Sequence, residues 1–241
     1  MRHRSGLTGR RVAVLLCCLM VGGCTSGESR SAALLAQVDH LVYATPDLDA
    51  SINELEHLLG VRATPGGRHP GWGTRNALLA LGERTYLEIL GPDPEQAQAG
   101  AASPFRVAQL QAPRVLTWAA RGTRLDRLVE DAKHRGLDLG AVSSGSRRRP
   151  DGGLLSWQLT DPAASRLDGL VPFFIDWGDT PHPAGTAAQG CTLVELRAEH
   201  PEPDLVRDML RAVGLDLPVR PGAVPALIAT IKTPRGVVEL H

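Results

Sequence analysis

Two residues of this 241-residue sequence place a metal-binding or proton-transferring group in an apolar surrounding. His40 lies in the segment VDHLVY at 38–43, and Glu88 lies in the segment TYLEIL at 85–90. Both segments are short and rich in β-branched, aromatic or leucine side chains, as buried strands are. Burying an imidazole or a carboxylate is costly unless the group is paired or bound to a metal. Because a nitrogen ligand beside a carboxylate suits a divalent transition metal, we predict that His40 and Glu88 hold zinc, nickel, manganese or iron.

Other interpretations of the two residues stay open at this point. His40 could be a buried histidine that is hydrogen-bonded to the backbone. Glu88 could form a salt bridge with Arg75 or Arg149, or it could act as a general base whose pKa is tuned by burial.

A glycine-rich segment between the two strands carries side chains that could line a ligand pocket. His69, Trp72 and Asn76 lie within GGRHPGWGTRN at 66–76. Glycine allows the backbone to approach a ligand closely, and loops of this kind often carry function. We predict that these three residues bind substrate, with His69 as a possible third metal ligand. The alternative is a tight bulged connection without a ligand.

Charged residues later in the chain complete the predicted site. Three arginines at 147–149 precede PDG at 150–152, which is a turn signal. Arg149 adjoins the turn, and we predict that it binds an anionic group of the substrate. Asp176 ends an apolar segment, and we predict that it faces the cavity and carries a proton, as Glu88 would. We assign the neighbouring Trp177 to the core.

The elements that must position these residues recur three times, in units at about 36–95, 112–180 and 190–241. Each unit reads as a strand, an amphipathic helix and two further strands, with a poorly defined strand after the helix. Apolar side chains at steps of three and four predict helices, and glycines follow them as C-terminal caps do. The predicted helices span 47–59, 124–135 and 202–214. The predicted strands span 38–44, 75–82, 85–91, 114–121, 154–160, 170–177, 191–198, 226–232 and 236–240.

The pattern predicts an α+β protein built from repeated βαβββ modules. Two modules side by side would form a curved mixed sheet that encloses a cavity, with the helices outside. His40 and Glu88 would then point from the concave face into the cavity. We expect His182, which lies in a loop between prolines, to be exposed.

The same residues resemble a known family. The strand with DHLVY at 39–43, the amphipathic helix, the glycine-rich loop and the strand with LEI at 87–89 resemble the glyoxalase, or vicinal oxygen chelate, superfamily. The segments at 66–79, 149–152 and 172–183 resemble its glyoxalase-like domain branch. The resemblance covers residues 36–240, and it implies paired βαβββ modules with metal ligands on the first and fourth strands.

His40 and Glu88 match these ligand positions in the first unit. In the second unit the matching positions hold Thr117 and Ile175, which are not ligands, so the chain departs from the four-ligand pattern. The resemblance implies a metal-assisted lyase, isomerase or dioxygenase that acts on a small vicinal-oxygen substrate. The alternatives are a metal-free protein that binds a small molecule and a purely structural envelope protein.

The N-terminal residues resemble an export signal. Four arginines precede the apolar run at 12–21, and VGGC at 21–24 resembles the lipobox of bacterial lipoproteins. We predict a signal peptide at 1–23, acylation of Cys24 as a membrane anchor, and a flexible tether at 24–35. The alternative is an ordinary signal peptide. Either way, we expect an exported protein.

Composition excludes some partners and constraints. The formal net charge is zero, which gives no electrostatic reason to expect nucleic acid as a partner. Removal of residues 1–23 and acylation of Cys24 would leave Cys191 as the one free thiol, so no intrachain disulfide is expected. The chain is 43% hydrophobic and 22% charged, as in ordinary globular proteins. A monomer and a homodimer both remain open.

Overall fold

The computed structural model describes residues 25–96, 103, 105–148, 152–164 and 167–241. The first unit consists of β1 (Val38–Ala44), α2 (Leu48–Leu59), β2 (Thr64–His69), β3 (Thr74–Gly82) and β4 (Thr85–Pro92). The second consists of β5 (Arg114–Arg121), α3 (Leu125–His134), β6 (Ser143–Arg148), β7 (Leu154–Leu159) and β8 (Phe173–Asp176). The third consists of β9 (Thr192–His200), α4 (Pro203–Ala212), β10 (Val219–Pro221), β11 (Ala226–Thr233) and β12 (Gly236–Leu240).

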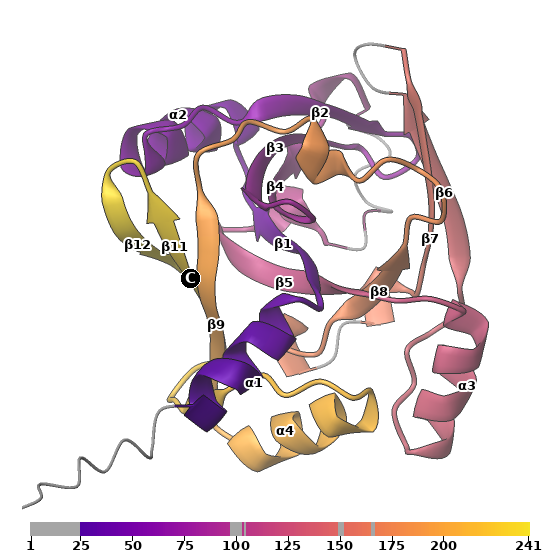
Figure 1. Ribbon diagram of the computed structural model, residues 1–241. Helices are drawn as coiled ribbons and strands as arrows, with labels where there is room; N and C mark the ends of the chain where they lie inside the picture. The colour runs from indigo at the N-terminus through magenta and orange to yellow at the C-terminus, as the bar shows by residue number, and fades with distance from the viewer. Residues whose placement is uncertain (1–24, 97–102, 104, 149–151, 165–166) are drawn as a thin grey trace, which may run out of the picture.

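The first two units share one eight-stranded sheet with the order β2-β3-β4-β1-β5-β8-β7-β6. In each unit the first strand pairs in parallel with the fourth, and β1 pairs antiparallel with β5 where the units meet. The sheet is strongly curved, and the helices lie outside it (Figure 1). The predicted α+β fold of repeated βαβββ modules is therefore confirmed.

The curvature brings the two edge strands of this sheet together. Arg147 on β6 donates a hydrogen bond from Nη1 to the carbonyl oxygen of Gly66 on β2. These strands stand at opposite ends of the strand order, so this contact nearly closes the sheet on itself. The concave face thus becomes the wall of a cavity.

Side chains alternate between the two faces of the sheet, because the period of a strand is two residues. Leu41 and Leu87 belong to the large core cluster on the convex face. Val42 and Tyr86 belong to a second cluster on the concave face. His40 and Glu88 alternate in step with the second pair, so both point to the concave side.

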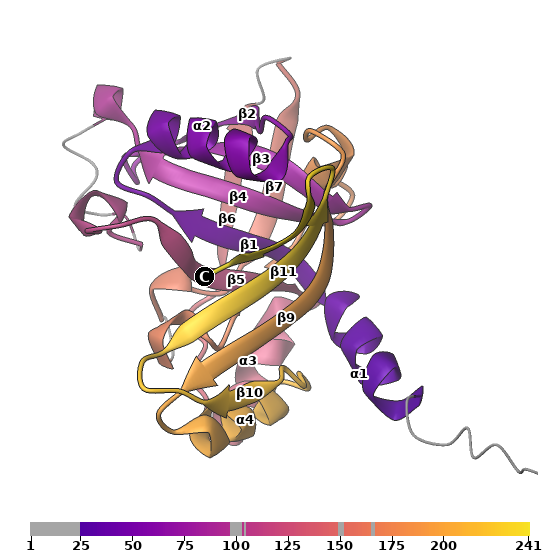
Figure 2. The same cartoon turned by 90° about the vertical axis from the view of Figure 1, so that its left-hand side faces the viewer.

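The third unit forms its own sheet, with the order β10-β9-β11-β12. Its first strand, β9, pairs in parallel with β10 and antiparallel with β11, so its pairing differs from that of the other two units. Figure 2 shows this sheet crossing the eight-stranded sheet on the outside. Leu196 and Ile231 share the convex core cluster with Leu41, so the third unit covers that face.

The strands that the sequence left undefined are β2, β6 and β10. All three are edge strands. Edge strands commonly carry proline, glycine and charged residues and lack a strong apolar pattern. The helix ends follow the expected capping: the Asp47 carboxylate accepts a hydrogen bond from the Ala50 amide at 3.0 Å, and Gly60 ends α2 with a φ of 78°.

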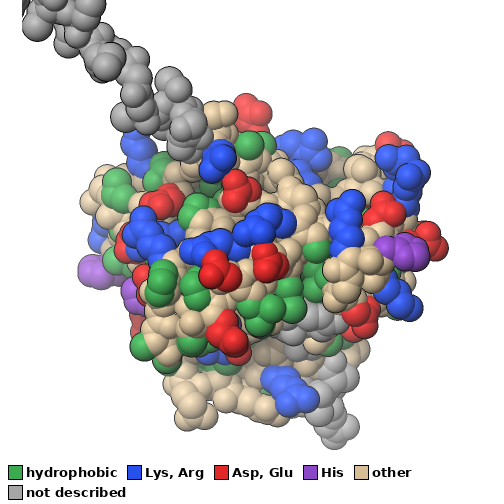
Figure 3. Space-filling model, turned by 90° about the horizontal axis from the view of Figure 1, so that it is seen from below, with side chains coloured by type: hydrophobic (Ala, Val, Ile, Leu, Met, Phe, Trp, Pro, Cys, Tyr) green, Lys and Arg blue, Asp and Glu red, His purple; other side chains and the backbone are tan. Residues whose placement is uncertain are grey.

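A helix stands where the sequence suggests a flexible tether. Residues Thr25–Leu35 form α1, and its Leu34 is buried in the convex core. The predicted signal peptide and Cys24 lie outside the described residues. Within the described part of the chain, no helix is long and apolar enough to span a membrane. The face seen from below, near α1 and α4, intersperses acidic and basic side chains (Figure 3).

Candidate functional site

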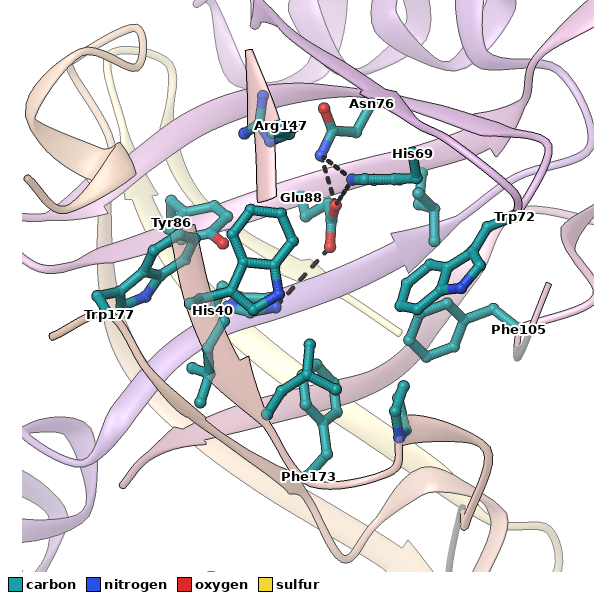
Figure 4. Close-up of a pocket in the computed structure, with 15 residues that line it drawn as sticks. His40, His69, Trp72, Asn76, Tyr86, Glu88, Phe105, Arg147, Phe173 and Trp177 are labelled. Atoms are coloured by element: carbon teal, nitrogen blue, oxygen red, sulfur yellow. Dashed lines mark hydrogen bonds and ion pairs between the residues drawn. The ribbon is translucent and has the colours of Figure 1, made fainter. Parts of the chain in front are cut away.

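A cavity of about 510 Å³, open space included, lies inside the curved sheet and is partly open to solvent. Its wall combines a ring of aromatic side chains with a small polar group (Figure 4). The aromatic residues are Trp72, Tyr86, Phe105, Trp157, Phe173 and Trp177. The polar residues are His40, His69, Asn76, Glu88 and Arg147.

Strand register brings the polar group together. His40 lies on β1 and Glu88 on the neighbouring β4, where Glu88 pairs with Val42. Asn76 lies on the next strand, β3. It is two residues from Leu78, which pairs with Glu88, so the side chains of Asn76 and Leu78 point to the same concave face. His69 ends β2 opposite Thr74. Three adjacent strands and the edge strand thus aim these side chains at one point.

A β-bulge gives His40 its partner. The register between β1 and β5 shifts between Val38 and His40, so Asp39 is the extra residue of the bulge. Its carboxylate, 1% exposed, lies 2.8 Å from His40 Nδ1. Bulges re-aim side chains in this way, and they are common beside active sites. Here the bulge turns two consecutive residues toward each other.

Two residues from the segment after β8 also bind Asp39. Trp177 donates its indole N–H to the carboxylate at 3.2 Å, and His182 Nε2 lies 3.1 Å from Oδ2. His182 Nδ1 accepts a hydrogen bond from the Ala184 amide. The ring proton of His182 therefore lies on Nε2, which donates a hydrogen bond to Asp39. The expectation that His182 is exposed is wrong, because its side chain is 9% exposed and packs edge-on against Tyr86 and Trp177 of the cavity wall.

These hydrogen bonds fix the charge of Asp39 and the tautomer of His40. Burial by itself would raise the pKa of Asp39, but the hydrogen bonds from His182 and His40 bring that pKa well below its usual range. An ionised carboxylate only accepts hydrogen bonds. His40 therefore carries a proton on Nδ1, and its Nε2 faces the cavity.

Glu88 lies between two imidazoles (Figure 4). Its Oε2 is 3.8 Å from His40 Nε2, and its Oε1 is 3.8 Å from His69 Nε2. Asn76 Nδ2 donates to Oε1 at 2.5 Å. The same amide nitrogen lies 3.4 Å from His69 Nε2, and His69 Nδ1 lies 3.0 Å from the hydroxyl of Thr74. Burial lowers the pKa of His69, so its imidazole is neutral with Nε2 as an acceptor.

The donor set does not fit a metal ion held by three side chains. The two imidazoles face different oxygens of Glu88, and Asn76 already occupies one of those oxygens. Across the described residues, no group of three or more His, Cys, Asp or Glu side chains is arranged to hold a metal ion. The described site therefore offers the predicted His40–Glu88 pair without a third ligand, although His69 was a possible one.

A buried cation completes the polar group, but it is not the predicted one. Arg147 lines the cavity, and its positive charge adds to burial in lowering the pKa of His69. Arg149 lies outside the described residues. The strand alternation of β6 explains why Arg147 rather than Arg148 is buried.

Asp176 does not line the cavity, so the expectation that it faces inward is wrong. Phe173 and Ile175 take the inward positions of β8, and the period of the strand turns Asp176 to the other side. Its Oδ1 accepts a hydrogen bond from the Gly178 amide and shapes a turn. Trp177 lies in the concave core cluster, as predicted, and it also lines the cavity. His69, Trp72 and Asn76 lie in the cavity wall, where the sequence predicted them.

The second unit contributes no charged group at the positions that match His40 and Glu88. Thr117 donates its hydroxyl to the carbonyl oxygen of Gly169 at 2.9 Å and does not reach the cavity. Ile175 supplies an apolar wall. Apart from Arg147 on β6, the polar side chains that line the cavity therefore come from the first unit.

Sequence reasoning did not find Asp39, Tyr86 or Arg147 as parts of the site. Tyr86 stacks on the His40 ring, with centroids 4.7 Å apart. Asp39 left a signal, because an acid beside a histidine inside an apolar strand needs a buried partner. The β-bulge that brings Asp39 and His40 together cannot be recognised from the sequence.

Comparisons with known proteins agree with the fold. Residues 38–214 match the family model described as glyoxalase-like domain, and no curated protein matches the chain. A hypothetical protein from Staphylococcus aureus has a similar structure: its TM-score is 0.58 at 14% identity, covering 84% of this chain and 83% of that one. This likeness concerns the fold alone.

Two epimerase structures are less similar. Methylmalonyl-CoA epimerase from Mycobacterium tuberculosis shows 20% identity and a TM-score of 0.38, covering 59% of this chain and 87% of that one. Streptomyces coelicolor methylmalonyl-CoA epimerase in complex with 2-nitronate-propionyl-CoA shows 20% identity and a TM-score of 0.41, covering 61% of this chain and 98% of that one. Nothing about activity follows from these scores.

Proposed function

Because this chain belongs to the glyoxalase-like domain family, we propose that it is an enzyme of the isomerase or lyase type that moves a proton on a small oxygen-rich molecule. One observation carries the proposal: His40 is held by the buried Asp39 and turns Nε2 toward Glu88 in an aromatic cavity. A carboxylate behind an imidazole is the arrangement that makes histidine an oriented general base.

The proposed step is the removal of a proton from a carbon beside a carbonyl group. His40 Nε2 accepts the proton, the C–H bond breaks, and its electron pair moves to the neighbouring carbonyl oxygen. The imidazolium that forms lies between two carboxylates, Asp39 at 2.8 Å and Glu88 at 3.8 Å, which stabilise its charge. His40 or Glu88 then returns a proton to the substrate.

The cavity wall favours a small, partly apolar acid or carbonyl compound. Arg147 supplies positive charge for a carboxylate or for the oxygen on which negative charge develops. The hydrogen-bond acceptors that face the cavity are His40 Nε2, His69 Nε2 and Glu88. A ligand that fits them carries hydroxyl or C–H protons. The aromatic side chains of the wall make the surroundings of these groups less polar, which strengthens their electrostatic interactions.

No step of this proposal uses a metal ion, since the described residues do not provide three ligands. A divalent ion at His40 and Glu88 remains the competing hypothesis from sequence. Elemental analysis of the purified protein and of His40→Ala tests it. Near-stoichiometric metal that disappears in the variant would overturn the metal-free proposal.

The direct test is deuterium exchange. We would incubate the protein in D2O with small 2-oxo, 2-hydroxy and 1,3-dicarbonyl acids and follow the loss of each C–H signal by proton NMR. Exchange catalysed by the wild type should fall by roughly 10²-fold or more in His40→Ala. Asp176→Asn, which removes a carboxylate outside the cavity, is the matched control and should exchange normally.

A binding protein is the second candidate, and the second unit favours it. Thr117 and Ile175 leave that half of the cavity without reactive groups. Saturable binding of an acid that depends on Arg147 but comes with no exchange in any compound would support binding over catalysis.

We also propose that the protein is exported and anchored by acylation of Cys24. The support is the basic segment, the apolar run and the VGGC motif of the sequence. Metabolic labelling with a radioactive fatty acid should mark the wild type and not Cys24→Ser. Equal labelling of both, or no labelling, would overturn the anchor.

A further inference from the structure

A second hollow adjoins the cavity and shares two wall residues with it. This groove, about 670 Å³ including open space, lies between η2 (Val107–Gln109) and the start of β5. Phe105 and Pro162 line both the groove and the cavity. A ligand in the cavity could therefore continue into the groove past these two side chains.

The groove combines an apolar floor with positive charge. Leu110 and Leu116 lie along it, together with the shared Phe105 and Pro162. Arg106 and Arg114 are its charged residues, and no acid is among the residues that line it. Both arginines are exposed. In the described part of the chain, neither side chain has an ion pair or a hydrogen bond, unlike Arg75 and Arg197, which pair with acids.

The backbone holds Arg106 in an unusual conformation. Its φ of 45° lies in the left-handed region, where a residue other than glycine is uncommon. Arg106 stands immediately before η2, so its side chain leaves the chain at a fixed point beside the groove. Two exposed cations beside an apolar channel attract an anion at the far end of an apolar chain.

We propose that this groove is a second subsite, which binds the terminal anionic group of a ligand whose reactive end lies in the cavity. The inference rests on the proposed function and narrows its substrate class. The ligand is a small acid or carbonyl compound with an apolar chain that ends in a carboxylate or a phosphate-like group. Arg106 and Arg114 bind the terminal group, and Leu110 and Leu116 contact the chain.

The test compares ligands that differ only at their far end. Isothermal titration would measure binding of straight-chain dicarboxylic acids of about four to ten carbons and of their monoamides with the same chain. An ω-phosphono acid of matched length distinguishes a phosphate-like terminus from a carboxylate. The proteins are the wild type, Arg106→Gln, Arg114→Gln and Arg147→Gln.

Arg124→Gln is the matched control, because Arg124 also precedes a helix with a left-handed φ, of 51°, but does not line the groove. In the wild type, a diacid of suitable length should bind roughly fivefold or more tightly than its monoamide, in line with one or two exposed ion pairs. Arg106→Gln and Arg114→Gln should each reduce this ratio and leave monoamide binding unchanged. Arg124→Gln should keep the ratio.

The outcomes separate the two proposals. Equal binding of diacid and monoamide at every length, with both dependent on Arg147, would overturn the subsite and leave the proposed function standing. A ratio that persists in both groove variants would also overturn it. Failure of every acid to bind would overturn the proposed substrate class and the subsite together.

Discussion

At Asp39 the chain buries a carboxylate and supplies hydrogen-bond donors from three side chains, His40, Trp177 and His182. The donors perform two different tasks. His40 gains a fixed orientation, whereas Trp177 and His182 compensate the desolvation of the charge. The two donors come from the segment that follows β8, so the second unit holds the base that the first unit presents. Asp39 and His182 are positioning residues, because they act through His40.

Asp39→Asn should change the tautomer of His40. The wild-type carboxylate accepts a hydrogen bond from Nδ1–H and favours the tautomer whose Nε2 carries no proton, whereas an asparagine can present its own N–H and favour the other tautomer. Nitrogen-15 NMR of the imidazole rings at neutral pH measures this directly, without any substrate. Asp47→Asn, at the start of α2, is the control. Identical His40 nitrogen shifts in wild type and Asp39→Asn would contradict the assigned tautomer.

His69 should make stability depend on pH on the acid side of neutrality. Burial lowers its pKa in the folded state below the unfolded value of about 6.5. The unfolded chain then binds more protons, so stability is fully present above that value and falls as pH drops below it. Urea unfolding at a series of pH values from about 7 to 5 should show a shallower decline for His69→Gln than for wild type.

The control for this measurement is His57→Gln, because His57 is exposed on α2. This substitution removes an exposed titratable imidazole, whereas His69→Gln removes a buried one. Equal slopes for wild type and His69→Gln would mean that the His69 imidazole is not buried in its neutral form.

Among the elements, the edge strand β2 is the one most closely tied to the site. Its register with β3 shifts between Pro65 and Gly67. At Gly66, a Cβ atom would lie 2.2 Å from Asn76 Oδ1 and 3.0 Å from Leu78 Cγ. Glycine at this position therefore lets β2 approach the side chain that donates to Glu88.

Gly66→Ala should displace Asn76 from Glu88 and cost roughly 1–3 kcal/mol of unfolding free energy, the usual range for overpacking. Gly185→Ala is the matched control, since a Cβ there meets no atom within 4 Å. Chemical denaturation of both variants measures the difference. A Gly66→Ala protein as stable as Gly185→Ala would show that β2 has room to move.

Elements with an apolar period were predictable from the sequence, and the others were not. The helices and the interior strands were predicted within a few residues, because burial imposes a period of 3.6 or two on them. The edge strands β2, β6 and β10 have a neighbour on one side only, so residues such as Pro65 and Pro221 are tolerated and the pattern disappears. Helix α1 was missed because its segment is small and polar.

The site was predictable where a single strand determines it. His40 and Glu88 follow from a side chain in each apolar strand that can bind a metal or transfer a proton, and His69, Trp72 and Asn76 follow from the glycine-rich segment between them. Contacts between distant segments left no local signal. Asp39 meets His182 across 143 positions, and Arg147 reaches Gly66 across 81. The position of Asp176 was predicted wrongly, because the alternation of side chains along β8 puts Phe173 and Ile175 on the cavity side instead.

For the whole molecule, the question is whether the third unit folds together with the cavity. Leu196 on β9, 1% exposed, lies in the same core cluster as Leu41 and Leu87 of the cavity-forming sheet. Leu34 of α1 joins that cluster as well. A shared core of this kind makes unfolding a single cooperative transition.

Leu196→Ala should therefore destabilise the cavity as much as the third unit, by about 2–5 kcal/mol for a buried leucine. Tryptophan fluorescence provides a selective probe, because the tryptophans are Trp72, Trp118, Trp157 and Trp177, all in the first two units. Far-ultraviolet circular dichroism reports on all three units. Both transitions should shift together in Leu196→Ala, whereas Val194→Ala, at a 40% exposed position of the same strand, should shift neither. A fluorescence transition that stays in place while the dichroism transition moves would mean that the third unit unfolds separately, and that the cavity does not depend on the core they share.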